Sequence, residues 1–106
     1  MTKHIQKDSY YAVIFTAKQS NNTEGYTEMV NKMSEFVKSQ KGFIGFESAN
    51  ENKNEITVSY WESMEDIRAW NANERHEEAK KGGKVKWYDS FTVRICEVKR
   101  EYAFKK

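Results

Sequence analysis

Residues 55–82 constrain the fold more than any other stretch, because they change from a strand pattern to a helix pattern within a few residues. Apolar and polar side chains alternate from Glu55 to Trp61, and β-branched and aromatic residues dominate, which predicts a strand. Ser63 then stands at an N-cap position, with Asp66 three residues later in the spacing of a capping box. We expect this strand and the helix that follows it to form one wall of any reactive pocket.

The remaining elements surround this unit. Alternation or apolar runs predict three further strands, and steps of three and four predict another helix. The predicted strands are residues 10–18, 43–49, 55–61 and 91–98, and the predicted helices are residues 26–40 and 64–81. Right-handed connections turn this β-α-β-β-α-β order into an α+β, ferredoxin-like antiparallel sheet with both helices on one face.

Several local features refine the predicted elements. Thr23 or Asn22 can cap the first helix, and Gly42 ends it. Gly45 inside the second strand predicts a bulge. The sequence Asn71–Asn73 weakens the second helix, which we expect to bend or split there. The Met and Phe stripe of the first helix is open to two interpretations, a ligand pocket or plain core.

The chain of 106 residues is predicted to be one domain, residues 10–106, preceded by a flexible arm, residues 1–9, that holds His4. Only 38% of residues are hydrophobic, so 3 Trp, 6 Tyr and 6 Phe must supply much of the buried area. The predicted strands carry apolar residues on both sides of the sheet, whereas the helices cover only one side. We therefore expect a second copy to cover the other face, giving a homodimer.

Composition excludes several classes of function. The net charge of +2 argues against a nucleic-acid partner. Lys41–Phe46 is a near miss to the aromatic motif of RNA-recognition domains, but it has one residue too many and lies on the wrong strand. No apolar run approaches a membrane span. The lone Cys96 predicts a reducing, cytoplasmic setting and an inert buried thiol, and no histidine or cysteine spacing predicts a metal.

Five segments together resemble the antibiotic biosynthesis monooxygenase family, whose members are dimeric α/β-barrel proteins. The resemblance covers roughly residues 10–104 and is carried by Lys41–Ser48, Tyr60–Ser63, Ser63–Trp70, Asn73–His76 and the Trp87-Tyr88 pair. It implies a homodimer of ferredoxin-like subunits, each with a pocket between sheet and helices. The family includes cofactor-independent quinol and polyphenol monooxygenases, haem-degrading monooxygenases and members without known activity.

The resemblance also assigns residues. Trp61 occupies the position of the family's tryptophan at the end of the third strand, and the asparagine found four residues earlier in cofactor-free members is Thr57 here. Trp70 matches the helix tryptophan of haem-degrading members. The histidine that those members carry ten residues later is Lys80 here, which makes haem degradation or haem binding the less favoured branch.

The chemistry of the side chains fits a monooxygenase that acts without metal, flavin or other cofactor on a small aromatic substrate and molecular oxygen. Deprotonation makes a quinol more reactive to oxygen, and His76 is the candidate base, with Trp61 as the second catalytic candidate. The predicted substrate-binding residues are Trp70, Phe46, Thr57, Trp87 and Tyr88. The alternatives are a solvated His76 with tryptophans in the core, a non-catalytic binder of haem or a hydrophobic ligand, and a purely structural dimer.

Overall fold

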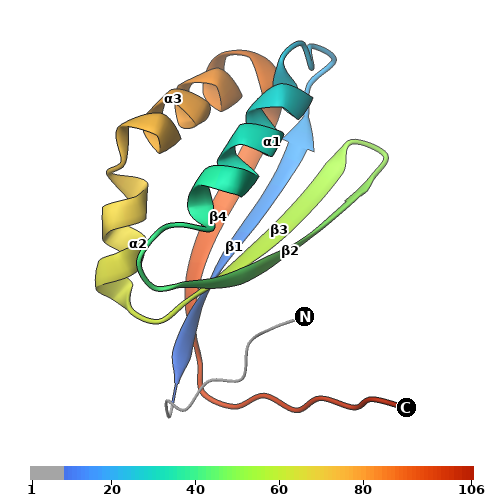
Figure 1. The fold of residues 1–106 in the computed structure, drawn as a ribbon. Coiled ribbons are helices and arrows are strands. Elements are labelled where there is room, and N and C mark those ends of the chain that lie inside the picture. Colours follow the sequence, from blue (N-terminus) through green and yellow to red (C-terminus); the bar gives the residue numbers. More distant parts are fainter. Residues whose placement is uncertain (1–8) are drawn as a thin grey trace.

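A computed structural model describes residues 9–106, apart from the side chains of residues 74, 75, 79, 83 and 85; the predicted N-terminal arm with His4 therefore lies almost wholly outside the described residues. The strands pair antiparallel in the order β2-β3-β1-β4, and the helices lie together on one face of the sheet (Figure 1). This is the predicted ferredoxin-like α+β fold with an open sheet. The elements are β1 (Tyr10–Gln19), α1 (Tyr26–Val37), β2 (Phe43–Glu51), β3 (Asn54–Trp61), α2 (Met64–Asn71), α3 (Glu74–Gly82), a π-helical turn (Gly83–Trp87) and β4 (Tyr88–Val98).

The register shows which side chains of the sheet face the helices. In β1, Tyr11 and Val13 pack against the buried core of Val37, Trp61 and Ile67. Antiparallel partners point to the same side of a sheet, so the partners of these β1 residues face the helices as well. On β3 this places Glu55, Thr57, Ser59 and Trp61 on the helix side, and Ile56, Val58 and Tyr60 on the outer side.

In strand β3, the mostly polar set of alternate residues therefore faces the helices, and the apolar set faces outward. This is the reverse of the usual arrangement, in which the buried face of a strand is the apolar one. A polar inner side indicates a surface made for hydrogen bonding, and an apolar outer side indicates a surface made for contact with protein.

The β2–β3 hairpin is tighter than predicted. The predicted strands ended at residue 49 and began again at residue 55, but both strands extend to a two-residue turn at Asn52 and Lys53, whose φ angles are 48° and 70°. Two positive φ angles suit the twist of an antiparallel hairpin, and asparagine tolerates this conformation well. The predicted bulge at Gly45 is confirmed, since the register shifts between Phe43 and Gly45.

The predicted caps fared differently at the two helices. Ser63 caps α2 as expected: its Oγ accepts a hydrogen bond from the Asp66 backbone N–H at 3.1 Å and donates to Asp66 Oδ2 at 2.8 Å. The predicted cap of α1 by Thr23 or Asn22 is wrong. Gly25 occupies the N-cap in a left-handed conformation (φ 79°) with no side-chain cap, because the chain turns there through a geometry that favours glycine.

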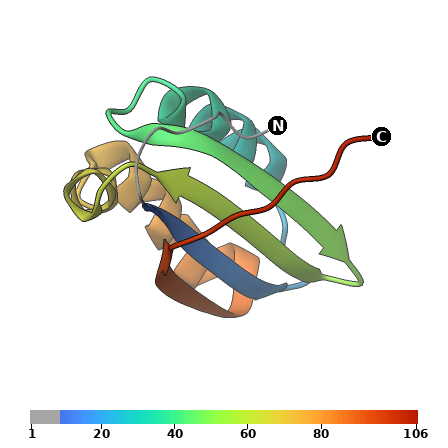
Figure 2. The same ribbon diagram turned by 90° about the horizontal axis from the view of Figure 1, so that it is seen from below.

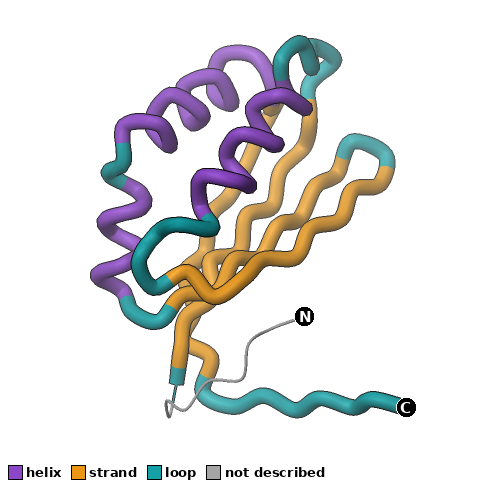
Figure 3. Tube along the Cα trace, viewed as in Figure 1, coloured by secondary structure: helices purple, strands orange, loops and turns teal. Residues whose placement is uncertain are grey.

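Two boundaries also differ from prediction. The first helix ends at Val37 rather than Gln40, because residues 38–42 form tight turns, and Gly42 (φ 81°) leads into β2. The last strand begins at Tyr88 rather than Phe91, because a register shift lets Tyr88 pair with Gln19. The predicted break in the second helix is confirmed as a loop between α2 and α3 (Figure 3).

Residues 99–106 leave the end of β4 as an extended tail, which runs past the end of the sheet in Figure 1 and in front of the sheet in the view from below (Figure 2). Burial and the Glu101 carboxylate of this tail raise the pKa of Tyr10 to about 12, and Tyr10 and Ala12 are buried. Tyr102 and Phe104 project from the tail with 82% and 87% of their surface exposed. Among the described residues, no helix combines the length and the apolar character needed to cross a membrane.

The prediction of a buried Cys96 thiol is wrong for the single chain. Cys96 pairs with Ala12 in register and so lies on the outer side of the edge strand β4, where it is exposed. No helix packs against this side of the sheet, so an outward-facing residue there stays open unless another chain covers it.

Candidate functional site

The rings of Trp70 and His76 stack across the break between α2 and α3. Their centroids are 4.6 Å apart and their planes differ by 16°. Trp70 lies in the last turn of α2, and its carbonyl oxygen, which accepts from the Asn73 backbone N–H at 3.1 Å, also lies 3.2 Å from His76 Nδ1. A carbonyl only accepts, so Nδ1 carries the proton, and Nε2 holds the lone pair of the neutral ring.

Burial lowers the pKa of His76 below its ordinary value of 6.5, because the half-buried charged ring loses hydration. The hydrogen bond to the Trp70 carbonyl and the carboxylate of Glu77 oppose this shift, whereas the positive charge of Lys80 adds to it. His76 is therefore neutral at pH 7, with Nε2 available to accept a proton.

Aromatic side chains continue from this pair into the core. Trp70 contacts Phe36 of α1 (5.6 Å between centroids) and Trp61 of β3 (6.1 Å). Trp61 in turn contacts Phe43 at 5.4 Å, and Phe43 contacts Phe46 at 6.3 Å. We refer to Phe36, Phe43, Phe46, Trp61, Trp70 and His76 as the His76 cluster.

Within the His76 cluster, the side chains differ in access. Trp61 is 1% exposed and donates from Nε1 to Ser59 Oγ at 3.0 Å, so it supports the ring of Trp70 from behind. Trp70 and His76 are half-buried, and Phe46 is exposed. Of these residues, Trp70, His76 and Phe46 can therefore meet a ligand without rearrangement of the core.

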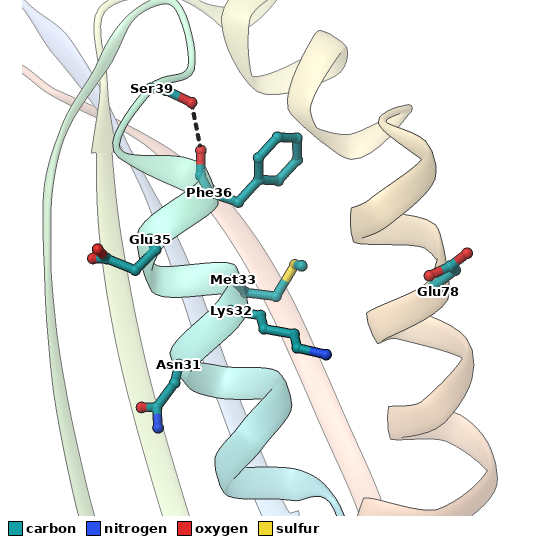
Figure 4. Close-up of a pocket in the computed structure, with 7 residues that line it drawn as sticks. All are labelled: Asn31, Lys32, Met33, Glu35, Phe36, Ser39 and Glu78. Carbon is teal, nitrogen blue, oxygen red and sulfur yellow. Dashed lines mark hydrogen bonds between the residues drawn. The ribbon is translucent and has the colours of Figure 1, made fainter.

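A groove of about 780 Å³ lies between α1 and α3, beside the His76 cluster. Met33 and Phe36 of α1 point toward α3, from which Glu78 faces them (Figure 4). Phe36 belongs both to the groove and to the His76 cluster, because its ring also contacts Trp70. The volume lies in the range of small-molecule sites. The lining residues are Asn31, Lys32, Met33, Glu35, Phe36, Ser39 and Glu78.

A second group of polar side chains lies at the other end of β3, around the buried carboxylate of Glu55. Glu55 is 8% exposed, and its Oε1 accepts hydrogen bonds from Tyr26 at 2.5 Å, Tyr88 at 3.2 Å and Gln19 at 3.3 Å. Thr57 Oγ1 donates to Oε2 at 3.3 Å. These five residues form the Glu55 cluster.

The two tyrosines of the Glu55 cluster remain protonated at physiological pH. Burial and the hydrogen bond to Glu55 raise the pKa of Tyr26 to about 12. Burial, the hydrogen bond to Tyr26 and the Glu55 carboxylate raise the pKa of Tyr88 further above its ordinary value. Both phenols are therefore donors, and Glu55 is the acceptor that organises them.

Trp87 is a packing residue of the core rather than a residue of an open site. It is buried, donates from Nε1 to the Glu24 carbonyl at 2.7 Å and packs on the ring of Tyr26. A Cβ added to Gly82 would lie 2.5 Å from the Trp87 ring, so the absence of a side chain at Gly82 allows this contact. Trp87 thereby ties the end of α3 to the start of α1.

The structure thus divides the predicted site residues into two groups. Trp61, Trp70, His76 and Phe46 belong to the His76 cluster, whereas Thr57, Trp87 and Tyr88 lie at the other end of the sheet. Thr57 and Trp61 are four positions apart on β3, a distance of about 13 Å. Among the residues that the structure describes, no three His, Cys, Asp or Glu side chains converge to hold a metal ion.

Sequence reasoning missed Glu55, Tyr26 and the site role of Phe36. One signal was available for Glu55, because it shares the parity of Trp61 and a charged residue on a core-facing parity is unusual. Tyr26 and Phe36 belong to the apolar stripe of α1, which the sequence could equally assign to core. Their contacts depend on how α1 lies on the sheet.

This architecture, a four-stranded antiparallel sheet with all helices on one face and an aromatic cluster beneath them, defines a ferredoxin-like α+β protein. The chain matches the family model described as Monooxygenase af470-like over residues 8–96, and it belongs to that family. The resemblance to antibiotic biosynthesis monooxygenases, stated from the sequence, is confirmed.

Known proteins agree with this assignment. The chain is 42% identical over 97 residues to the uncharacterized protein YqjZ of Bacillus subtilis, covering 91% of this chain and 85% of YqjZ. Its fold is similar to that of SnoaB, a cofactor-independent oxygenase from Streptomyces nogalater, at 11% identity and a TM-score of 0.67 over 94% of this chain and 100% of SnoaB. It is also similar to protein SO0527 from Shewanella oneidensis, at 10% identity and a TM-score of 0.74 over 86% and 92% of the two chains. The two structural likenesses concern the fold alone.

Proposed function

We propose that this chain is a cofactor-independent monooxygenase that oxidises a small aromatic substrate of the quinol or polyphenol type with molecular oxygen. The observation that carries the proposal is the Trp70–His76 pair. A neutral imidazole, fixed through Nδ1, is stacked on an indole that contacts Phe36, and Phe36 lines a groove of about 780 Å³. Membership of the monooxygenase family and the fold shared with SnoaB support it.

In this proposal, His76 Nε2 accepts the phenolic proton of the bound substrate. The resulting anion is electron-rich and reacts with oxygen. For a quinol, one oxygen atom forms the new ring C–O bond and the other leaves as water with two hydrogen atoms, giving a hydroxyquinone. All four electrons that oxygen accepts come from the substrate, so the reaction balances without an external reductant.

The remaining residues of the His76 cluster take positioning roles. Trp70 and Phe36 offer ring faces to a planar substrate, since aromatic rings pack favourably in offset and edge arrangements. Phe46 extends this aromatic surface from β2. Trp61 acts through Trp70, whose ring it supports, rather than by touching the substrate.

The proposed unit is a homodimer that pairs the outer faces of two sheets. Ile56 on that face is 43% exposed although it is apolar, and β3 directs its apolar parity there. The exposed Tyr102 and Phe104 of the tail add aromatic surface at its margin. A second copy would cover both, and it would also cover Cys96. The free thiol of Cys96 is best preserved, before and after pairing, in a reducing, cytoplasmic setting, which cell fractionation would check.

Oxygen uptake by the chelator-treated protein tests the enzymatic proposal. The panel contains quinols, anthrones and catechols, measured with the wild type, His76→Ala and Lys81→Gln. Lys81 is an exposed residue of the same helix, and its charge is not among those that shift the pKa of His76, so its variant controls for general disturbance of α3. Uptake that is lost in His76→Ala and kept in Lys81→Gln supports the proposal.

Two results would contradict it in different ways. Uptake that survives in His76→Ala removes His76 from the chemistry and keeps the enzyme. Absence of uptake across the whole panel overturns the monooxygenase assignment. A saturable Soret shift on titration with haemin would then support the alternative of a haem-binding member of the same fold.

A further inference from the structure

One row of side chains crosses the outer face of the sheet and carries opposite charges at its two ends. Ile14 pairs in register with Val58 on one side and with Arg94 on the other. Val58 pairs in turn with Glu47. Partners in an antiparallel sheet point to the same side, and Val58 lies on the outer side, so the whole row does. From β2 to β4 the row has a negative end, an apolar centre of two residues and a positive end.

The two charged ends of this row, Glu47 and Arg94, are exposed in the single chain. The hydroxyl of Tyr60 donates to Glu47 Oε2 at 2.7 Å, and this bond together with burial raises the pKa of Tyr60 to about 12. A carboxylate accepts more hydrogen bonds than this one, so Glu47 retains capacity. Among the described residues, Arg94 has no carboxylate partner. A second copy that covered this face without pairing Arg94 would bury an uncompensated charge, which is costly.

The row is complementary to itself about a two-fold axis that runs parallel to the strands and passes between Val58 and Ile14. Rotation about this axis turns the second sheet over and reverses the order of its strands, so β4 faces β2 of the partner and β1 faces β3. Arg94 then lies over Glu47 of the partner subunit, and the apolar centres meet. An axis perpendicular to the strands would place each charge over its own counterpart, which like-charge repulsion disfavours.

The neighbouring row fits the same axis by size. It contains, from β2 to β4, Gly45, Tyr60, Ala12 and Cys96. The rotation places Tyr60 over the small Ala12 of the partner subunit, and Cys96 over Gly45 of the partner subunit. Large residues opposite small ones let two faces interlock. Aligned sheets pack about 10 Å apart, a gap that a glutamate and an arginine extended from opposite faces bridge between them.

We propose that two copies of this chain pair with β2 of each opposite β4 of the other, and that Glu47 of each copy forms an ion pair with Arg94 of the partner subunit. The proposal rests on the homodimer of the proposed function and deepens it, because it assigns the orientation of the two copies and the contacts that set it. Arginine binds a carboxylate in a fork geometry, so the two ion pairs fix the register in which the apolar centres meet.

Charge reversal followed by mixing tests the proposal, with sedimentation equilibrium measuring the Kd of the dimer. Glu47→Arg and Arg94→Glu should each raise Kd about tenfold or more, because the axis repeats the contact and each reversal replaces two attractions with two repulsions. An equimolar mixture of the two variants should return Kd to within about threefold of the wild type. In the mixed dimer, each introduced charge again faces an opposite charge on the other chain.

Glu97→Arg is the matched control. Glu97 is also an exposed glutamate on an edge strand, but it pairs with Tyr11 and so lies on the helix-facing side. Its variant should keep the Kd of the wild type. Arg94→Glu keeps the test decisive if Glu47→Arg fails to fold through loss of the Tyr60 hydrogen bond, because Arg94 has no carboxylate partner within the described part of its own chain.

Three results would overturn the proposal: a reversal that leaves Kd unchanged, a mixture that associates no more tightly than the separate variants, or a Glu97→Arg dimer weakened as much as that of Glu47→Arg. A wild-type dimer that is insensitive to both reversals rejects the ion pairs and leaves the homodimer standing. A wild type that stays monomeric rejects both. Oxygen uptake is measured separately, so the monooxygenase assignment stands or falls on its own experiment.

Discussion

The Trp70 carbonyl oxygen and His76 Nδ1 lie 3.2 Å apart across the gap between two helices, so the end of α2 fixes the tautomer of a side chain on α3. The same residue supplies the ring on which the imidazole stacks. Any shift of α3 relative to α2 would therefore change both the orientation and the protonation of His76. This coupling makes the histidine sensitive to pH in a direction that can be worked out.

Replacing His76 with Gln should flatten the dependence of stability on pH between about pH 7.5 and pH 5. The folded-state pKa of His76 is lowered below 6.5, so the unfolded chain binds the proton more readily than the folded chain. The stability contributed by the neutral ring is present above pH 6.5 and is lost as the pH falls through that value toward the folded-state pKa. Urea denaturation of the wild type and His76→Gln at several pH values measures the difference.

The same shift predicts the pH profile of oxygen uptake. If His76 is the base, kcat/KM rises with pH to a plateau, and the midpoint lies below 6.5. A midpoint above 6.5, or a stability profile that is identical in the wild type and His76→Gln, would contradict the neutral, half-buried histidine described above.

Replacing Gly42 with Ala should lower the free energy of unfolding by about 2–4 kcal/mol, from a left-handed backbone and the loss of a helix cap. Gly42 has a φ of 81°, and an added Cβ would overlap the carboxyl group of Asp66, which the Ser63 hydroxyl holds in the α2 capping box. Thermal or urea denaturation measures the loss.

Gly45 provides the matched control for this prediction. It is only three residues away, and an added Cβ there would meet no atom within 4 Å. Gly45→Ala should change the free energy of unfolding by no more than about 0.5 kcal/mol, in the range usual for surface substitutions. Equal losses in the two variants would show that the contact between Gly42 and Asp66 is not the cause.

The sequence was sufficient for the order of the elements because each carries a local signal. Alternation marks β3, the Ser63–Asp66 spacing marks the start of α2, and residues 71–73 mark its end. These signals depend on neighbours within a few residues, and the structure confirms them. The cap of α1 was missed because a left-handed glycine replaced the side-chain cap that the composition of the loop suggested.

The site was less predictable because it depends on which side of each strand faces the helices. In β3, either set of alternate residues could have packed against the helices, and the mostly polar set is the one that does. Unless it is known which side of β3 faces the helices, Glu55 is interpreted as an exposed charge beside a turn and not as the centre of a buried hydrogen-bond network. The stacking of His76 on Trp70 is equally non-local, since six residues and a helix break separate them.

Replacing Tyr26 with Phe should cost about 1–3 kcal/mol at pH 7, because the substitution removes a hydrogen bond to the buried Glu55 carboxylate. It should also weaken the loss of stability in alkali. The pKa of Tyr26 is raised to about 12 in the folded chain, so the folded state holds the proton more tightly than the unfolded state. The contribution of protonated Tyr26 to the free energy of unfolding is therefore fully present below pH 10 and is lost as the pH rises toward 12.

Urea denaturation at pH 8 and pH 10.5 separates these effects, with Tyr102→Phe as the control. Tyr102 is a tyrosine of the exposed tail, so its variant should match the wild type at both pH values. If Tyr26→Phe also matches the wild type at pH 8, the short hydrogen bond to Glu55 contributes nothing to folding.

Replacing Ile56 with Lys should convert the proposed homodimer into a monomer, because a charge would enter the apolar outer face of the sheet. Val93→Lys is the matched control. Val93 is likewise apolar and similarly exposed, 49% against 43%, but it lies on the helix-facing side of edge strand β4. Sedimentation equilibrium over a tenfold range of concentration should give a dimer for the wild type and Val93→Lys and a monomer for Ile56→Lys. A wild type that sediments as a monomer throughout would reject pairing through this face.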